Sequence, residues 1–174
     1  MRPATGQVLH FSENPRITRF TPHVAATARQ SEPYVWAVDA EQAPAYWFPR
    51  DCPRVLAWPS PRTTAADRRF LFDRRLHAIE YGWLPAVQTV RLYAYRFDAA
   101  AFRPIGSPRP HAMVATTPVA PLGPAEPVGD LLALHEAAGI QFRLVENLWP
   151  IVDEIAASTL EFSGIRLRNA AARK

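Results

Sequence analysis

Short apolar stretches between polar and proline-rich segments predict most of the strands of this chain. Residues 7–11 form such a stretch near the start, residues 34–38 are almost continuously apolar, and residues 54–58 lie between prolines. An almost uninterrupted apolar run is typical of a strand that is covered on both faces. The same kind of pattern predicts strands over 87–97, 112–117 and 140–145.

Apolar positions at helical spacing predict the helices. The strongest such pattern covers residues 65–81, which follow a capping threonine and end at Gly82. Two further helices are expected over 128–138 and 148–157, and Asp39 can cap a short helix that begins near Pro44.

The order of these elements indicates the fold class. Strands and helices are mixed irregularly along the chain, which favours an α+β domain over a doubly wound sheet. In the last predicted strand, within residues 158–169, the apolar positions on the two sides of Gly164 are out of phase, which predicts a bulge or a tight turn there.

Length and composition limit the classes of protein. The 174 residues fit one domain, 1–174, and a hydrophobic fraction of 48% with 21% charged residues is ordinary for a globular protein. The single cysteine, Cys52, excludes an internal disulfide and fits a reducing compartment, so we expect a cytoplasmic protein. No apolar run reaches the length needed to span a bilayer, so no membrane partner is expected.

The net charge of +4 allows weak attraction to phosphates, but the basic residues are scattered. Of the 20 basic residues, only Lys174 is a lysine. The densest group of arginines, within residues 67–75, is interrupted by Asp67 and Asp73. Such a pattern is more typical of a solvated helix face than of a nucleic-acid patch. Nucleic acid is therefore a weakly supported partner.

Several common mechanisms lack their residues. The seven glycines form no phosphate-binding loop pattern, and no G-x-S-x-G motif is present. The five histidines show no H-x-x-x-H pairing and one cysteine cannot build a thiolate zinc site, so we expect no metal. Cys52 as a nucleophile stays an alternative, but its neighbour Asp51 disfavours a thiolate and favours a structural role.

A histidine and two aromatic residues in the first third of the chain remain as candidates for a binding site. His10 lies on the first predicted strand, Trp36 on the second, and Tyr46 on the helix that follows Asp39. An imidazole can hydrogen-bond a sugar hydroxyl, and flat aromatic faces bind a flat cationic pyridinium well. Each of these residues taken alone is more often an ordinary core residue.

The motifs L-H-F-S and V-W-A-V-D, with a tyrosine after them, resemble the opening of the ADP-ribosyltransferase-like fold. The resemblance implies a mixed, split sheet with flanking helices around a cleft that binds NAD. It also implies that His10 and Ser12 hold ribose or phosphate and that Trp36 and Tyr46 form an aromatic wall. The whole chain further resembles an uncharacterised bacterial family of small proteins that open on L-x-H-F-S-E.

The chain departs from the resemblance in a late segment. The fold usually presents a glutamate there, whose charge stabilises the cationic sugar, whereas residues 111–121 contain no acid and His111 stands near the expected place. This departure leaves three alternatives. Either the chemistry differs, or another acid such as Glu161 takes the role of the glutamate, or the site binds its ligand without turnover. We therefore expect binding of NAD or a related nucleotide, with weak ADP-ribosyl transfer through His10 and His111 at most. The alternative is a non-enzymatic interaction domain that contacts an acidic partner.

Overall fold

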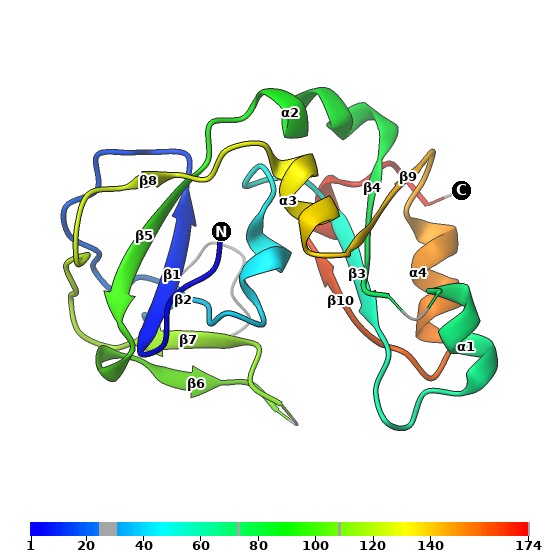
Figure 1. Ribbon diagram of the computed structural model, residues 1–174, viewed down its shortest axis with the longest axis horizontal. Helices are drawn as coiled ribbons and strands as arrows, with labels where there is room; N and C mark the ends of the chain where they lie inside the picture. Colours follow the sequence, from blue (N-terminus) through cyan, green and yellow to red (C-terminus); the bar gives the residue numbers. More distant parts are fainter. Residues whose placement is uncertain (25–30, 73, 108, 174) are drawn as a thin grey trace. The chain divides into compact units, whose positions relative to one another are not determined.

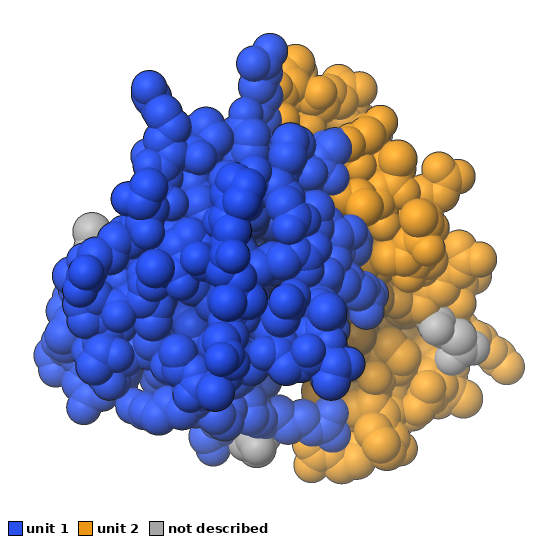
Figure 2. All heavy atoms as spheres, turned by 60° about the vertical axis from the view of Figure 1, so that its left-hand side comes forward, with its two compact units in different colours: residues 1–47, 91–129 blue, residues 48–90, 130–174 orange. Residues whose placement is uncertain are grey.

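The computed structural model describes residues 1–24, 31–72, 74–107 and 109–173, which form two compact units. Unit 1 takes residues 1–47 and 91–129, and unit 2 takes residues 48–90 and 130–174 (Figure 2). The chain thus crosses from one unit to the other after residues 47, 90 and 129. The prediction of one domain over 1–174 stays a prediction.

Unit 1 is built from two small antiparallel sheets, with strand orders β1-β5-β8 and β2-β7-β6 (Figure 1). Its strands are β1 (Gln7–Ser12), β2 (Val35–Ala37), β5 (Tyr93–Asp98), β6 (Arg103–Ile105), β7 (Ala112–Ala115) and β8 (Glu126–Pro127), and its 3-10 helices are η1 (Ala43–Tyr46) and η3 (Ala99–Ala101). Val8 and Phe97 of the first sheet pack with Val35 and Ala115 of the second in one core. A backbone bridge between Leu9 and Val38 also joins the two sheets.

Unit 2 contains a mixed four-stranded sheet of order β10-β3-β4-β9, in which β9 runs parallel to β4 and the other pairs are antiparallel. Its strands are β3 (Arg54–Trp58), β4 (Leu76–Glu80), β9 (Gln141–Val145) and β10 (Glu161–Ile165), and its helices are α1 (Ala65–Phe70), η2 (Tyr81–Trp83), α2 (Leu84–Thr89), α3 (Leu131–Ala137), α4 (Trp149–Ala156) and η4 (Leu167–Asn169). Across the part of the chain that the structure describes, no helix has the length and apolar character needed to cross a membrane.

Alternation along the strands of unit 2 gives its sheet two different faces. Val55 and Ala78 point to one face, where they pack with Ile151 and Ile155 of α4. The opposite face carries His77, which contacts His135 of α3. Both faces of β4 are therefore covered, and all five of its residues are buried.

The prediction of a long helix over 65–81 is wrong. Helix α1 ends at Phe70, Phe72 adopts a left-handed conformation with φ of 47°, and residues 76–80 form the central strand β4. A strand that is covered on both faces is apolar at successive positions, and over a few residues such a run resembles the apolar spacing of a buried helix.

Two further predictions need correction. The first part of the predicted strand 87–97 is helix α2, because Pro85 in the first turn fits a helix start, and β5 begins only at Tyr93. No bulge interrupts β10 at Gly164, which pairs with Val55 in unbroken register. The phase change lies within the strand, where Phe162 is exposed and Ile165, on the opposite face, is half-buried. The turn follows at Arg166, which is left-handed with φ of 57°, and Leu167 packs against the bare Gly164.

The other elements agree with the sequence. Strands were predicted at β1, β2, β3, β7 and β9, and helices at α3 and α4, with ends that differ by a few residues. The α+β class is confirmed.

Candidate functional site

His10 lies on β1 of unit 1, where it is half-buried and pairs with Tyr95 of β5. Its ring centroid is 4.9 Å from that of Phe20, and its Nδ1 is 2.8 Å from the carbonyl oxygen of Trp36. A carbonyl oxygen only accepts hydrogen bonds, so Nδ1 carries the proton, and in the neutral ring Nε2 is the acceptor. The backbone of β2 thereby fixes both the tautomer and the orientation of this imidazole.

Ser12 ends β1 and organises the turn that follows. Its side chain is mostly buried, and its Oγ accepts a hydrogen bond from the Asn14 backbone N–H at 3.1 Å. The hydroxyl of Tyr95 donates to the carbonyl of Asn14 at 2.6 Å and accepts from the N–H of Ile17 at 2.9 Å. Ser12 and Tyr95 together fix this turn beside His10.

Trp36 reaches His10 through its backbone, and its side chain joins a different group. Val35 and Ala37 point into the core of unit 1, so the indole of Trp36 lies on the other face of β2. There it packs edge-on against Tyr34, with ring centroids 5.8 Å apart. The guanidinium of Arg103 lies 5.5 Å from the centroid of the Tyr34 ring and donates to the Tyr34 hydroxyl at 3.1 Å.

Tyr46 and His111 lie on other parts of unit 1. Tyr46 is half-buried at the end of η1, which has Pro44 in its first turn as predicted. The N-cap of η1 is Gln42 and not Asp39, whose carboxylate accepts from the N–H groups of Glu41 and Gln42 in the turn before the helix. His111 is exposed after the β6–β7 turn, and its ring fills the space beside Gly106. A Cβ on Gly106 would lie 2.2 Å from Nδ1 of His111, and the φ of 124° at Gly106 also favours glycine.

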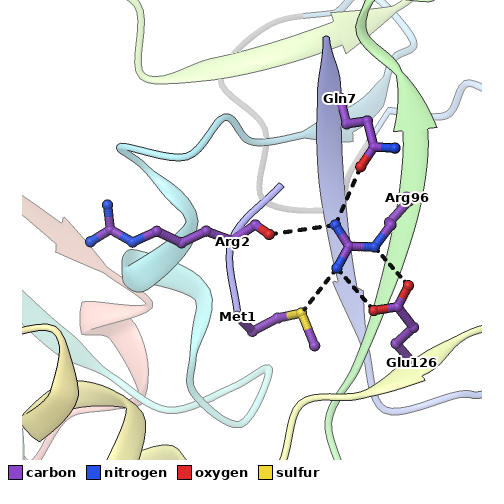
Figure 3. A network of polar contacts seen from close by, with 5 residues as sticks. All are labelled: Met1, Arg2, Gln7, Arg96 and Glu126. Carbon is purple, nitrogen blue, oxygen red and sulfur yellow. Dashed lines mark hydrogen bonds and ion pairs between the residues drawn. The ribbon is translucent and has the colours of Figure 1, made fainter. Parts of the chain in front are cut away.

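A network around Arg96 joins β1 to β5 and β8 (Figure 3). Because Arg96 pairs with Leu9, the network lies on the face of β1 opposite His10. Arg96 donates to both carboxylate oxygens of Glu126, at 2.6 and 2.9 Å, and its Nη1 donates to Gln7 and to the carbonyl of Arg2. These hydrogen bonds hold the pKa of Glu126 below its usual value and raise that of Arg96. Burial, with the charges of Arg2 and Arg96, lowers the pKa of the Met1 amino group.

The two other residues considered for catalysis, Glu161 and Cys52, lie in unit 2. Glu161, the acid considered for a catalytic role, accepts a hydrogen bond from the indole N–H of Trp58 at 3.0 Å within unit 2. Cys52 is fully buried, and burial raises the pKa of its thiol to about 12, so it is protonated at neutral pH. Among the residues that the structure describes, no group of three or more His, Cys, Asp or Glu side chains is placed to hold a metal ion.

The sequence interpretation missed Phe20, Tyr95, Tyr34 and Arg103, which contact the predicted residues. Tyr95 has a visible signal, because it falls in the alternating part of 87–97, whereas Phe20 meets His10 only through the fold. An open surface depression of unit 1 is lined by residues 15–18, 121 and 123–125, and none of the five predicted site residues belongs to it.

Comparison with known proteins gives a family and no activity. The chain matches no curated protein and no solved structure. A family model described as "Family of unknown function (DUF6886)" matches residues 9–170, which include every predicted site residue and nearly all of both units. The chain belongs to this family of unknown function, DUF6886.

Proposed function

We propose that unit 1 binds NAD or a related nucleotide, with the ribose at His10. The observation that carries the proposal is the hydrogen bond from His10 Nδ1 to the Trp36 carbonyl, because it directs the acceptor lone pair of the neutral ring to Nε2. A ribose hydroxyl is a donor suited to this acceptor. The Ser12 hydroxyl accepts from Asn14, and its own proton can be donated to a ribose or phosphate oxygen.

The resemblance to ADP-ribosyltransferases supports the identity of the ligand. The two small sheets of unit 1, joined by the bridge between Leu9 and Val38 next to His10, support the comparison. In this proposal Trp36 and Tyr46 contribute aromatic surface for the nicotinamide, and the cytoplasm is the expected setting. Transfer of ADP-ribose is slow, because His111 replaces the glutamate of the resembled fold and supplies no fixed negative charge.

Isothermal titration of NAD into the whole protein tests the binding step. We expect His10→Ala to weaken binding by about tenfold, the scale of one hydrogen bond to a buried or half-buried group. The matched control is His23→Ala, since His23 is an exposed histidine of the same unit. Equal affinities of wild type and His10→Ala would contradict the assignment, and an absence of binding by the wild type would favour the interaction-domain alternative.

Nicotinamide release tests the transfer step. His111→Glu places a carboxylate where the late acid is expected, so release should rise above the wild-type rate. The double variant His10→Ala, His111→Glu is the control and should lose this gain. Fast wild-type release that His111→Glu abolishes would show that the histidine itself performs the chemistry.

A further inference from the structure

Two histidines of unit 2 form a buried pair that the proposed function does not use. His77 of β4 and His135 of α3 both have no exposed surface, and their ring centroids are 5.0 Å apart. Phe48 and Phe142 pack against the pair, with centroids 5.0 Å from that of His135. The pair therefore lies in an apolar environment between helix and sheet.

The hydrogen bonds of the pair have a single direction. His135 Nδ1 is 2.6 Å from the carbonyl oxygen of Leu131, which can only accept, so the proton of neutral His135 is on Nδ1. His135 Nε2 is then an acceptor, and it lies 3.0 Å from His77 Nδ1. His77 must therefore carry its proton on Nδ1 as well.

The last nitrogen of this chain of hydrogen bonds is His77 Nε2. It is buried and has no hydrogen-bond partner among the described residues. The charged groups that act on His77 are Arg54 of β3 and Arg75, two residues before it in the chain. Both of these charges are positive, so they disfavour protonation of His77.

Titration of the two rings follows from these surroundings. Burial, the neighbouring His135 and the two arginines lower the pKa of His77 well below its ordinary value. Burial lowers the pKa of His135 to about 4, and Arg54 acts in the same direction. Both rings are neutral while α3 is in place at neutral pH.

We propose that the His77–His135 pair is an acid-sensitive latch that holds α3 on the sheet of unit 2. Protonation of His135 turns its Nε2 into a donor that faces the Nδ1–H of His77, and the hydrogen bond between them is lost. Both charged forms are better solvated when α3 has left the sheet, so acid favours the open form. The latch is a property of unit 2 that does not depend on nucleotide binding by unit 1.

Helix α3 is the first element of unit 2 after the chain leaves unit 1 for the second time. The chain returns from unit 1 to unit 2 after Gly129, and the Asp130 carboxylate caps α3 at once by accepting from the N–H groups of Leu132 and Ala133. Opening of α3 therefore loosens the segment by which the chain enters unit 2 for the second time.

The first test is the tautomer of each ring in the unmodified protein. Long-range proton–nitrogen correlation spectra of the ¹⁵N-labelled full chain distinguish Nδ1–H from Nε2–H imidazoles. We expect both His77 and His135 as Nδ1–H neutral tautomers at neutral pH, although the Nε2–H form is the ordinary one in solution. An Nε2–H tautomer at either ring would overturn the proposal.

The second test is hydrogen exchange of the α3 amides, corrected for the intrinsic pH dependence of exchange. Opening of α3 should increase on the order of thirtyfold between about pH 7.5 and pH 5 from His135 alone, given an ordinary histidine pKa of about 6.5. His135→Gln keeps a polar side chain that does not titrate, and it should lose most of this increase. His23→Gln is the control and should behave as the wild type.

Two outcomes of the exchange test would overturn the latch. One is an unchanged opening of α3 over this pH range in the wild type. The other is an equal pH dependence in wild type and His135→Gln. If His135→Gln does not fold, the wild-type tautomers and the wild-type exchange profile still decide the question.

Discussion

Among single residues, Glu80 joins two segments of unit 2 that are far apart in the chain. It is 6% exposed, its Oε1 accepts from the N–H of Leu148 at 3.1 Å, and both its oxygens lie within 3.1 Å of the N–H of Ala171. One carboxylate thus holds the start of α4 and the C-terminal segment. Glu80→Gln removes the negative charge that both amides face, and it replaces Oε2, which accepts from the Ala171 N–H at 3.0 Å, by an NH₂ group that cannot accept.

We expect Glu80→Gln to lower the free energy of unfolding by about 2–3 kcal/mol, the scale of a hydrogen bond to a buried charged group. Urea denaturation measures the loss. Glu154→Gln, at an exposed site of α4, is the control and should stay within about 0.5 kcal/mol of the wild type. Similar values for the two variants would show that Glu80 does not tie these segments together.

The contribution of Glu126 to the free energy of unfolding depends on pH. Its pKa is lowered in the folded protein by Arg96, so its contribution is complete above the pKa of the unfolded state, about 4.3, and is lost as the pH falls through the lower folded value. Because Glu126 is 42% exposed, solvent weakens the pair, and we expect Glu126→Gln to cost about 0.5–1 kcal/mol at neutral pH.

Denaturant titrations of wild type and Glu126→Gln at several pH values measure this difference. The two curves should converge in acid. A difference that grows as the pH falls would contradict the assigned pair.

Individual site residues could be predicted from the sequence only where a short motif contains them. His10 and Ser12 both lie in the motif L-H-F-S, and the sequence indicated both. Glu80, His77 and His135 find their partners far along the chain, and no local pattern distinguishes a histidine that meets another histidine from one that meets a phenylalanine. Burial and hydrogen bonding of such residues are set by the packing of whole elements.

At the scale of elements, the end of α1 is the place where the sequence interpretation failed most clearly. Leu71 is the C-cap of this helix and Phe72, the next residue, is left-handed, a position that usually carries glycine. Its ring is 74% exposed, so it contributes little packing. The periodicity of residues 65–81 continues through this point, which hides the helix end.

We expect Phe72→Gly to raise the free energy of unfolding by about 0.5–1 kcal/mol, because glycine adopts the left-handed conformation without steric cost. Thermal melting measures the gain. Phe72→Ala removes the same ring but keeps the strain, so it should leave stability nearly unchanged. If Phe72→Ala stabilises the protein as much as Phe72→Gly, then the exposed ring of Phe72 destabilises the protein and its left-handed backbone conformation does not.

For the whole molecule, the question is whether the two units can fold separately. A chain of residues 1–129 contains all of unit 1 but lacks α3, β9, α4 and β10. We expect residues 1–47 and 91–129 to keep dispersed amide signals in NMR spectra, while residues 48–90 give signals near random-coil values. Loss of dispersion throughout would instead favour the single cooperative domain predicted from the sequence.

The α+β class could be predicted because it needs only the order of the elements. The division into two units could not, because it depends on which strands pair across the crossings of the chain. The parallel pairing of β4 with β9 joins strands that are separated by the whole second segment of unit 1. Nothing local to either strand specifies that partner.

This interleaving also sets an order of events during synthesis. Unit 1 is complete once Gly129 has left the ribosome, whereas β4 waits for β9 and β3 waits for β10. Domains generally fold as units during translation, and N-terminal parts fold first. While unit 1 is being finished, the nascent chain therefore contains the apolar strands β3 and β4 without their neighbours β10 and β9. A chaperone that binds apolar segments is expected to act during this interval.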